Sequence, residues 1–342
     1  MNILYLTPTS AFSGGENVTL QIAQEMQKRG YTVAYCGVFG PIQEAAEARG
    51  VAFLGLKEFS LKEIRGVLRE FRPEVVHAMD YRASFYAALL GTRMVGHLHS
   101  DCPWLKYKGR NSFALLYTGL RARKLICVAP NIPRNFVFSR WIGSKFATLA
   151  NCIDADAIRQ KAQRGPGTQA AHLGFCGRLS EAKNPLLFLR VVAGVKAQLP
   201  GVKAVMVGDG ELRTQVEREI QALGLQQNVS LVGFQNNPFP YIAACKLMVM
   251  SSVWEGFPMV AMEAMVLGKP WVSTAVSGMV DLIDDSVGAI GNTAEELTAA
   301  VLKILQLPSN EYNLLTTRVR KRVQPYTNMA TYIDEIEAFY QS

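Results

Sequence analysis

Two closely spaced carboxylates stand out in the second half of the chain. Glu255 lies in the stretch SVWEGFP, and Glu263 lies in the apolar run MVAMEAMVL that follows it. Gly256 permits a tight turn and Pro258 suits a first helical turn, so the spacing predicts a loop and then a helix over about 258–267. The unpaired amides at the start of such a helix attract anions, and the two carboxylates can accept hydrogen bonds from sugar hydroxyls. A carboxylate inside an apolar run also needs a polar partner, which favours a ligand near Glu263.

Two cations occupy a second motif, directly after an apolar strand pattern. Arg178 and Lys183 lie in the stretch GRLSEAKNP. A guanidinium group and an ammonium group in one loop are suited to clamp a diphosphate. Gly177 precedes them, and Gly208 and Asp209 follow the next predicted strand, where glycine leaves the backbone open to a phosphate or a flat base. Taken alone, two surface cations and an ordinary turn remain the alternatives.

The first half of the chain offers weaker candidates. Gly14 and Gly15 follow the first predicted strand in a loop, where their amides can face an anion or a sugar. They match neither the GxGxxG nor the GxxxxGK[ST] pattern, so NAD and P-loop nucleotide sites lose their main support. His99 and Asp101 end another strand, in HLHSD. A metal triad with His97 is conceivable there, but no second cluster supports it and we expect no metal; one of the two histidines should be a buried core residue.

The composition is that of a globular protein with a large core. The 342 residues are 49% hydrophobic and 19% charged, and at about 100–200 residues per domain the length indicates two domains. No run approaches the roughly 20 apolar residues of a membrane-spanning helix, and we expect no secretory signal. The 6 cysteines show no CxxC or CxxH spacing, which favours reduced thiols in the cytoplasm over a zinc site or a disulfide framework.

The net charge of +8 is concentrated in the first half of the chain. Between Asp101 and Asp154 there is no acidic residue, and aromatic residues are interleaved with the basic ones. Basic side chains with interfacial aromatics suit an anionic membrane surface. An ordinary solvated face is one alternative, and a nucleic-acid surface, for which no recognisable motif is present, is another. The candidate membrane-surface residues are Trp104, Lys106, Lys108, Arg110, Arg121, Arg123 and Lys124.

Apolar strands alternate with helical stretches along most of the chain. The pattern begins with NILYLT at 2–7 and restarts with HLGFCGRL after a polar stretch at 155–170, which we interpret as a linker with a Gly-Pro-Gly break. Such alternation predicts parallel βαβ units. We therefore expect an α/β fold of two Rossmann-like, doubly wound domains, residues 1–160 and 171–325, that face each other across a cleft. Ligands of such sheets bind outside the carboxyl ends of the strands, where the motifs lie.

The motifs together resemble those of the family 4 glycosyltransferases of the GT-B fold. Glu255-Gly-Phe-Pro and Glu263-Ala-Met match the E-x7-E signature of that family, and the stretches GRL, KNP and VGDGE follow the expected order. The resemblance covers the whole chain and is strongest over 171–275. It implies a nucleotide-sugar donor, with a UDP-sugar expected, as the co-substrate of the second domain. It also implies transfer with retention of anomeric configuration, and neither a metal nor a tightly bound cofactor.

The resemblance assigns a role to each motif residue. Arg178 and Lys183 would neutralise the donor diphosphate, and Glu263 would hold the ribose hydroxyls. Glu255 would hold the sugar and phosphate, and His99 would lie beside the transferred sugar. Of these, Glu255, His99, Arg178 and Lys183 are the expected catalytic residues. The other expected donor-binding residues are Gly14, Gly15, Gly177, Gly208, Asp209, Gly256, Phe257, Pro258, Met259 and Val260.

The acceptor is expected on the first domain, onto which a helix over about 326–342 would cross back. Asp101 and His99 are the candidates to contact the acceptor or to act as a base. The basic, aromatic segment fits a lipid-linked saccharide acceptor, as in polysaccharide or O-antigen assembly, with the protein cytoplasmic and peripheral at the inner membrane. Two other classes stay open: a nucleotide-sugar epimerase or hydrolase of the same fold, and a nucleic-acid-binding protein, although we expect no nucleic-acid partner.

Overall fold

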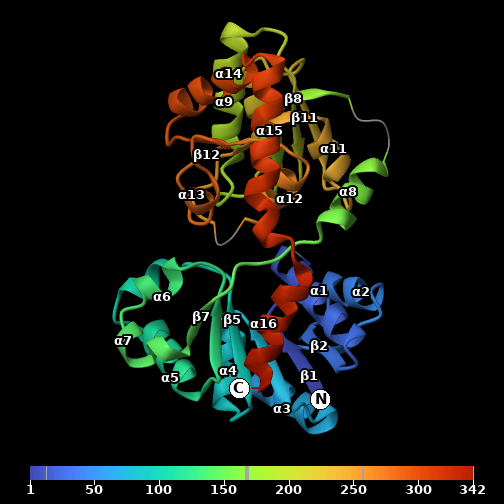
Figure 1. Ribbon diagram of the computed structural model, residues 1–342, viewed down its shortest axis with the longest axis vertical. Helices are drawn as coiled ribbons and strands as arrows, with labels where there is room; N and C mark the ends of the chain where they lie inside the picture. The colour runs from blue at the N-terminus through green and yellow to red at the C-terminus, as the bar shows by residue number, and fades with distance from the viewer. Residues whose placement is uncertain (13, 166–168, 256–257, 342) are drawn as a thin grey trace. The chain divides into compact units, whose positions relative to one another are not determined.

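The chain folds into two compact units, which Figure 1 shows in a computed structural model. Unit 1 comprises residues 1–152 and 329–342, and unit 2 comprises residues 153–328. Each unit is built on one parallel β-sheet whose strand order reverses in its middle. The predicted α/β class with two doubly wound, Rossmann-like domains is confirmed. The structure describes residues 1–12, 14–165, 169–255 and 258–341.

Unit 1 contains a 7-stranded sheet in the order β3-β2-β1-β4-β5-β6-β7. Its central strands are apolar runs buried on both faces, as parallel sheets covered by helices require. The strands are β1 (Asn2–Leu6), β2 (Thr32–Val38), β3 (Ala52–Leu56), β4 (Val75–Met79), β5 (Met94–Leu98), β6 (Lys124–Cys127) and β7 (Phe146–Thr148). The helices are α1 (Gly14–Lys28), α2 (Pro41–Glu47), α3 (Leu61–Phe71), α4 (Tyr81–Leu89), η1 (Pro103–Lys106), α5 (Arg110–Arg121), α6 (Asn131–Asn135), α7 (Ser139–Ile142), η2 (Gly143–Lys145) and α16 (Met329–Gln341).

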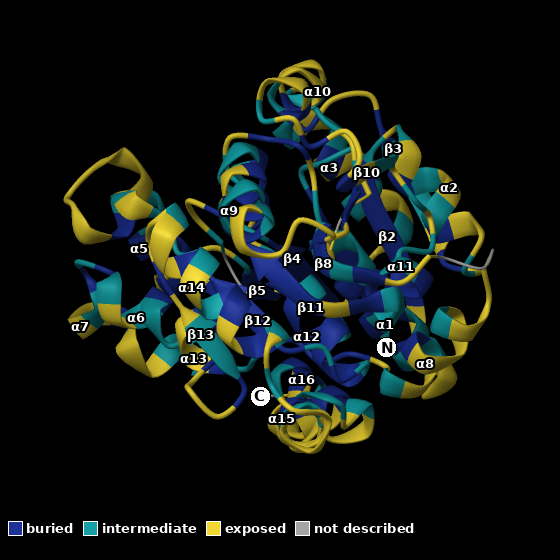
Figure 2. Ribbon diagram, turned by 90° about the horizontal axis from the view of Figure 1, so that it is seen from above, coloured by how far each residue is buried: buried dark blue, intermediate teal, exposed yellow. Residues whose placement is uncertain are grey.

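Unit 2 contains a 6-stranded sheet in the order β10-β9-β8-β11-β12-β13. Buried strands form its centre, and exposed residues lie on the outer helices (Figure 2). The strands are β8 (Ala171–Cys176), β9 (Ala204–Val207), β10 (Val229–Gly233), β11 (Cys245–Met250), β12 (Trp271–Ser273) and β13 (Gly288–Ile290). The helices are α8 (Ala155–Gln163), α9 (Pro185–Gln198), α10 (Arg213–Ala222), α11 (Phe239–Ala244), α12 (Met259–Val266), α13 (Met279–Leu282), α14 (Ala294–Leu305), α15 (Ser309–Val323) and η3 (Gln324–Tyr326).

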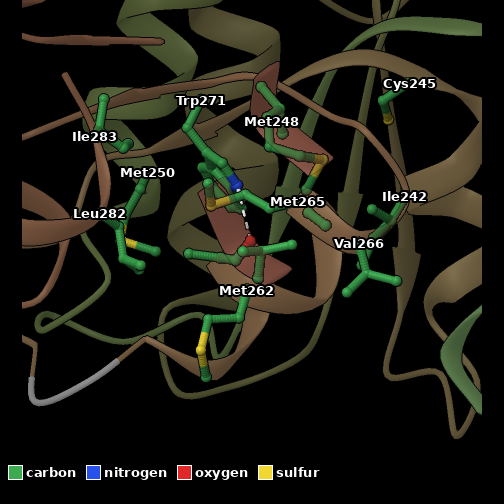
Figure 3. Packing of buried hydrophobic residues seen from close by; sticks show 14 of the residues in the cluster. Ile242, Cys245, Met248, Met250, Met262, Met265, Val266, Trp271, Leu282 and Ile283 are labelled. Carbon is green, nitrogen blue, oxygen red and sulfur yellow. Dashed lines mark hydrogen bonds between the residues drawn. The ribbon is translucent and has the colours of Figure 1, made fainter. Parts of the chain in front are cut away.

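Helix α12, which carries Glu263, is anchored in a methionine-rich part of the unit 2 core (Figure 3). Met262 and Met265 of this helix are buried in the same cluster as Met248 of β11. Trp271 of β12 is also buried there, and its indole nitrogen donates a 3.2 Å hydrogen bond to the carbonyl of Ala261. This bond fixes the helix against the sheet, so its partly buried side chains, which include Glu263, are held in place.

The boundary between the units lies earlier than the sequence pattern indicates. The stretch 155–170, interpreted as a linker, contains α8, whose N-cap Asp154 accepts a 2.9 Å bond from the amide of Ala157. Ile158 is buried, and α8 packs against α11 and α12. Residues 153–160 therefore belong to unit 2, because Ile158, with Ala155 and Ala162 beside it, packs α8 against the core of that unit. Of the Gly-Pro-Gly break, Pro166 and Gly167 lie outside the described residues.

The final helix, α16, belongs to unit 1, whereas α15 before it belongs to unit 2. Arg29, directly after α1, pairs with both Asp334 and Glu337 of α16. Near the other end of α16, Arg93 donates a 2.7 Å bond to the carbonyl of Tyr340. Arginines therefore hold both halves of this helix, and its buried side chains include Tyr332 and Tyr340. No helix within the described ranges is long and apolar enough to span a bilayer.

Candidate active site

Two glycine-containing loops interlock at the carboxyl ends of β8 and β9. The amide of Gly177 bonds to the carbonyl of Val207 at 2.9 Å, and that of Leu179 bonds to the carbonyl of Asp209 at 3.0 Å. A Cβ atom on Gly208, whose φ is 137°, would lie 1.9 Å from the Gly177 carbonyl oxygen. Glycine is needed at 208 because one loop backbone packs directly on the other, which is a different reason from the approach of a ligand.

A second pair of loops brings Lys183 next to Glu255. The hydroxyl of Ser251 donates to the carbonyl of Lys183 at 3.0 Å, and the amide of Val253 donates to the carbonyl of Ala182 at 2.8 Å. These bonds join the loop after β8 to the loop after β11, the two central strands of the sheet. The motif residues of both loops therefore converge at one edge of unit 2.

Lys183 and Glu255 form an ion pair. The Lys183 Nζ atom lies 2.5 Å from Glu255 Oε1, which also accepts a 2.6 Å bond from the hydroxyl of Ser252. The side chain of Glu255 is 9% exposed and that of Lys183 is 27% exposed. The two were predicted to contact different parts of the donor, and here they contact each other. An ammonium group has three donors, so Lys183 can hold Glu255 and still bind an anion.

Arg178 lies exposed on the same edge of the sheet. Within the part of the chain that the structure describes, its guanidinium group has neither a hydrogen bond nor an ion pair. Asp209, in contrast, is engaged: it accepts bonds from the amide of Gly210 at 2.8 Å and from Arg213 at 3.0 Å. Arg178 is thus available for an anionic ligand, whereas Asp209 has a structural role in its turn.

Glu263 is partly buried on α12 between Met262 and Ala264, both of which are buried. It has no hydrogen-bond partner among the described residues. Desolvation by burial raises the pKa of its carboxyl group to about 7, against a smaller opposing effect of Lys161. Burial raises the pKa of the Cys176 thiol at the end of β8; the Glu263 charge adds to this shift, and the Lys183 charge opposes it. The charges of Glu263 and Lys183 therefore both lie close enough to the end of β8 to affect Cys176.

Helix α12 begins at Met259, after Pro258 in an extended conformation. Ala261 donates to the carbonyl of Pro258 at 2.9 Å, while the amides of Met259 and Val260 donate to no described residue. At the predicted anion site, these two amides of the helix start are therefore available to bind a ligand. Gly256 and Phe257, also predicted to bind the donor, lie outside the described residues.

In unit 1, His99 and Asp101 follow β5. The ring of His99 stacks on that of His97 at 4.3 Å, and its Nε2 atom is buried without a partner in the described structure. Burial lowers the pKa of His99 to about 4, so the ring is neutral near pH 7. Asp101 accepts two bonds, of 3.1 and 2.9 Å, from the side-chain amide of Asn135. His97 is fully buried, which confirms that one histidine of the pair is a core residue.

Gly14 and Gly15 lie in the first turn of α1 rather than in the predicted loop. The hydroxyl of Thr19, one turn further along this helix, donates to the Gly15 carbonyl at 2.9 Å. A Cβ atom on Gly15 would meet nothing within 4 Å among the described atoms, so space is open beside this residue. As for metals, no group of three or more His, Cys, Asp or Glu side chains in the described ranges could hold an ion.

Three supporting residues carried no role in the sequence prediction. Ser252 orients Glu255, the hydroxyl of Thr274 fixes the Ser252 carbonyl at 2.6 Å, and Asn135 holds Asp101. Ser252 stands three positions before Glu255, a spacing that allows a side-chain bond across a turn. Thr274 and Asn135 are distant in sequence from their partners, so no local pattern identifies them.

The predicted membrane-surface residues divide into two groups. Four are exposed as expected, namely Lys106, Lys108, Arg110 and Arg121. The other three are not free: the Trp104 ring packs edge-on against Tyr81 at 4.8 Å, Lys124 donates to the Ser144 carbonyl at 2.9 Å, and Arg123 has a buried guanidinium nitrogen. The most exposed apolar side chains of this region are instead Tyr107, Phe113, Leu120 and Trp141.

The fold and the carboxyl edge of the unit 2 sheet define a class of protein. It has two α/β units, and the loops at this edge of the second sheet carry both cations and carboxylates. The family model described as "Glycosyl transferases group 1" matches residues 156–322, and the model "Glycosyltransferase Family 4" matches residues 12–157. The chain therefore belongs to the family 4 glycosyltransferases.

Two curated relatives and one solved structure illustrate the similarity. An uncharacterized glycosyltransferase of Methanocaldococcus jannaschii is 40% identical over 62% of this chain, and the match spans 58% of that relative. The UDP-Gal:alpha-D-GlcNAc-diphosphoundecaprenol alpha-1,3-galactosyltransferase of Escherichia coli is 24% identical over 82% of this chain and 78% of its own length. The Anabaena HepE structure with UDP-glucose matches with a TM-score of 0.83 at 19% identity, over 99% of this chain and 98% of that one.

Proposed function

We propose that this chain transfers a sugar from a UDP-sugar to a saccharide acceptor. The observation that carries the proposal is the edge of the unit 2 sheet. There Lys183 is held on Glu255, while Arg178 and the first amides of α12 have no partner among the described residues. Each of these groups can donate to a diphosphate. The name of the E. coli relative gives UDP-Gal as its donor, and the Anabaena structure contains UDP-glucose.

In the proposed reaction, the bond between the anomeric carbon and the donor phosphate oxygen breaks, and UDP leaves. Arg178 and Lys183 stabilise the negative charge that develops on the diphosphate. Glu255, fixed by Ser252, accepts bonds from the sugar hydroxyls. The acceptor hydroxyl attacks from the face that UDP leaves, so the anomeric configuration is retained, and its proton passes to a donor phosphate oxygen.

The neutral ring of His99 contacts the transferred sugar through Nε2 in this proposal, and Glu263 accepts the ribose hydroxyls. Both groups lack partners in the described structure, which supports a ligand-binding role for each. Asp101 is held by Asn135 with both oxygens engaged, so we assign it to orienting the acceptor rather than to taking its proton.

The proposed acceptor is a saccharide linked to a lipid diphosphate, because the E. coli relative and a Campylobacter jejuni relative, 35% identical over 43% of this chain, are both named for diphospho-undecaprenol substrates. The test incubates the protein with UDP-glucose, UDP-galactose and their N-acetylamino forms, with and without a diphosphoundecaprenol-linked GlcNAc acceptor. We expect UDP release that depends on the acceptor, and a product whose anomeric proton coupling matches that of the donor. Equal UDP release without the acceptor would indicate a hydrolase, and isomerised donor would indicate an epimerase; either would contradict the proposal.

We also propose that unit 1 binds the surface of an anionic membrane. The rings of Phe113 on α5 and Trp141 on α7 both pack on Phe138, at 4.9 and 5.9 Å, and both are largely exposed. Exposed Arg110 and Arg121 lie at the two ends of α5. Aromatic side chains flanked by arginines suit the boundary between lipid headgroups and acyl chains.

Co-sedimentation with phosphatidylglycerol vesicles at low salt tests this surface. We expect the double substitution F113A/W141A to reduce the bound fraction at least about tenfold. The loss of each aromatic ring removes roughly 1–3 kcal/mol of the binding free energy that comes from burying it in the membrane. Leu314→Ala, at an exposed apolar residue of unit 2, is the control and should bind as the wild type does. Failure of the wild-type protein to sediment with these vesicles would overturn the membrane proposal and leave the transferase proposal standing.

A further inference from the structure

A chain of buried hydrogen bonds connects the last helix of the protein to the residues around His99. The hydroxyl of Tyr340 on α16 lies 2.5 Å from Nδ1 of His77 on β4. Nε2 of His77 lies 3.2 Å from Nδ1 of His97 on β5. At the other end, the hydroxyls of Tyr5 and Tyr340 are 3.3 Å apart. These four side chains are all buried, so this chain of bonds is sealed from solvent.

The three imidazole rings also form a stack. The His77 and His97 rings are 5.3 Å apart with an angle of 15° between their planes, and those of His97 and His99 are 4.3 Å apart with an angle of 23°. Tyr340 closes the stack with an edge contact on His77, at 5.6 Å and 77°. The orientation of His99, the last ring before the loop, therefore depends on His97, and that of His97 depends on His77.

All three rings are neutral near pH 7. Burial lowers the pKa of His77 to about 3 and that of His99 to about 4, and it holds that of His97 well below the ordinary value. Each neutral ring has one nitrogen that donates and one that accepts. Two arrangements run in one direction along the whole chain of bonds, with every donor pointing either toward His97 or toward Tyr5.

The two arrangements differ in what they leave unsatisfied. If Tyr5 donates to Tyr340, Tyr340 to His77 and His77 to His97, all donors are used except the Nε2–H of His97. If the direction is reversed, the Nε2 atom of His97 becomes a bare acceptor, and the Tyr5 hydroxyl is the donor left over. Nε2 of His97 has no partner among the described residues, so the direction of the chain decides its chemistry.

We propose that Tyr340 is a positioning residue for His99, because its hydroxyl sets the tautomers of His77 and His97 and so fixes the ring on which His99 stacks. This inference rests on the proposed function in one respect only, namely that His99 contacts the transferred sugar. Tyr340 touches no substrate. The last helix of the chain thus contributes to the site through a chain of bonds that spans more than three hundred positions of sequence.

Tyr340→Phe tests the role of the hydroxyl, since phenylalanine retains the packing and loses only the hydrogen bonds. We expect the rate of UDP release from the UDP-sugar and diphosphoundecaprenol-linked acceptor assay to fall roughly 5- to 30-fold in kcat, with KM for the UDP-sugar changed less than about twofold. Tyr332→Phe is the matched control, because the Tyr332 hydroxyl lies on the same helix, buried and without a partner among the described residues. Equal kcat values for wild type, Y340F and Y332F would overturn the proposal.

Nitrogen-15 NMR of the histidine rings tests the same inference without any substrate. In the wild-type protein at pH 7 we expect His77 and His97 each to show one protonated and one bare nitrogen, that is, a single tautomer. In Y340F the resonances of both rings should average or shift, and those of His99 should move with them, while Y332F leaves all three unchanged. Averaged tautomers in the wild type, or unaltered His99 signals in Y340F, would contradict the proposal. Because this readout requires no activity, it separates a failure of the positioning role from a failure of the proposed transferase function.

Discussion

Glu263 shows at the scale of one residue how binding competes with stability. Its carboxyl group lies in the apolar face of α12 without a partner in the described structure, and burial raises its pKa to about 7. Above pH 7 the folded protein therefore holds a desolvated carboxylate, whereas water solvates the same carboxylate in the unfolded chain. A ribose with two hydroxyl groups would supply the hydrogen bonds that this carboxylate lacks.

Glu263→Gln removes that charge. The unfolded carboxyl titrates near 4.5 and the folded one near 7, so the substitution should stabilise unit 2 by about 3 kcal/mol at pH 8 and by less than about 1 kcal/mol at pH 5. Urea unfolding at the two pH values measures this difference. UDP affinity, measured by calorimetry at pH 8, should fall at least about tenfold in the same variant.

Glu311→Gln is the matched control for this substitution, because Glu311 is an exposed residue of α15 in the same unit. It should leave UDP affinity unchanged and alter stability by less than about 1 kcal/mol at either pH. If E263Q were as unstable at pH 8 as the wild type and bound UDP equally well, Glu263 would be an ordinary helix residue.

Much of the candidate site at this scale can be predicted from sequence, but its pairings cannot. Local motifs predict Arg178, Lys183 and Glu255 because each follows a strand pattern, and Glu263 because it interrupts an apolar run. The ion pair of Lys183 with Glu255 joins residues 72 positions apart, and periodicity within a segment carries no information on which loops will touch. The same limit applies to Tyr340 and His77, which are 263 positions apart.

At the scale of elements, the interlocked loops after β8 and β9 are the most constrained part of unit 2. Gly208→Ala would place a Cβ atom 1.9 Å from the Gly177 carbonyl oxygen, at a φ of 137° that alanine rarely adopts. We expect the variant to lose about 3 kcal/mol of unfolding free energy, the upper end of the usual range for a point substitution.

Gly201→Ala provides the comparison, because a Cβ atom there meets nothing within 4 Å among the described atoms. It should change the unfolding free energy by less than about 1 kcal/mol, in the stabilising direction. Urea denaturation of both variants measures the effect. A Gly208→Ala protein as stable as Gly201→Ala would show that the two loops are not packed as described.

The elements themselves were predictable where apolar residues recur with a clear period. Buried strands such as β4 and β5 appear as continuous apolar runs, and α3 appears as a helix whose N-cap Ser60 is visible in the sequence. Helix α8 was missed because its only buried residue is Ile158, too little to give an apolar stripe. Strand β13 was missed because it has three residues, GAI, and lies at the sheet edge.

At the scale of the whole molecule, the two units should respond to acid in opposite ways. Unit 1 contains three histidines whose pKa values are depressed by burial. Below pH 6.5 these histidines bind protons in the unfolded chain but stay neutral in the folded unit. Its stability is therefore present above pH 6.5 and lost as the pH falls toward 4. Unit 2 contains Glu263, whose raised pKa makes the folded unit bind a proton between pH 7 and 4.5, which adds stability in acid.

Between pH 7.5 and 5.5 we expect the unfolding free energy of unit 1 to fall by about 4 kcal/mol, because pH 5.5 lies one unit below the pKa of each of the three histidines in the unfolded chain. The unfolding free energy of unit 2 should rise by about 2 kcal/mol over the same range. Differential scanning calorimetry at the two pH values measures both, as a downward shift of one transition and an upward shift of the other. E263Q assigns the transitions, because it should abolish the upward shift alone. Parallel shifts of both transitions would contradict the assignment of these pKa values to burial.

The central claim, that the carboxyl edge of the unit 2 sheet holds a diphosphate, is tested most directly by UDP titration calorimetry on Arg178→Gln. Arg178 is exposed and has no partner within the described ranges, so the substitution should not disturb the fold. Arg190→Gln, at an exposed arginine of α9 in the same unit, is the control. The account predicts that Arg178→Gln raises the Kd for UDP roughly 10- to 100-fold while Arg190→Gln leaves it within twofold of the wild type. Equal affinities in all three proteins would contradict it.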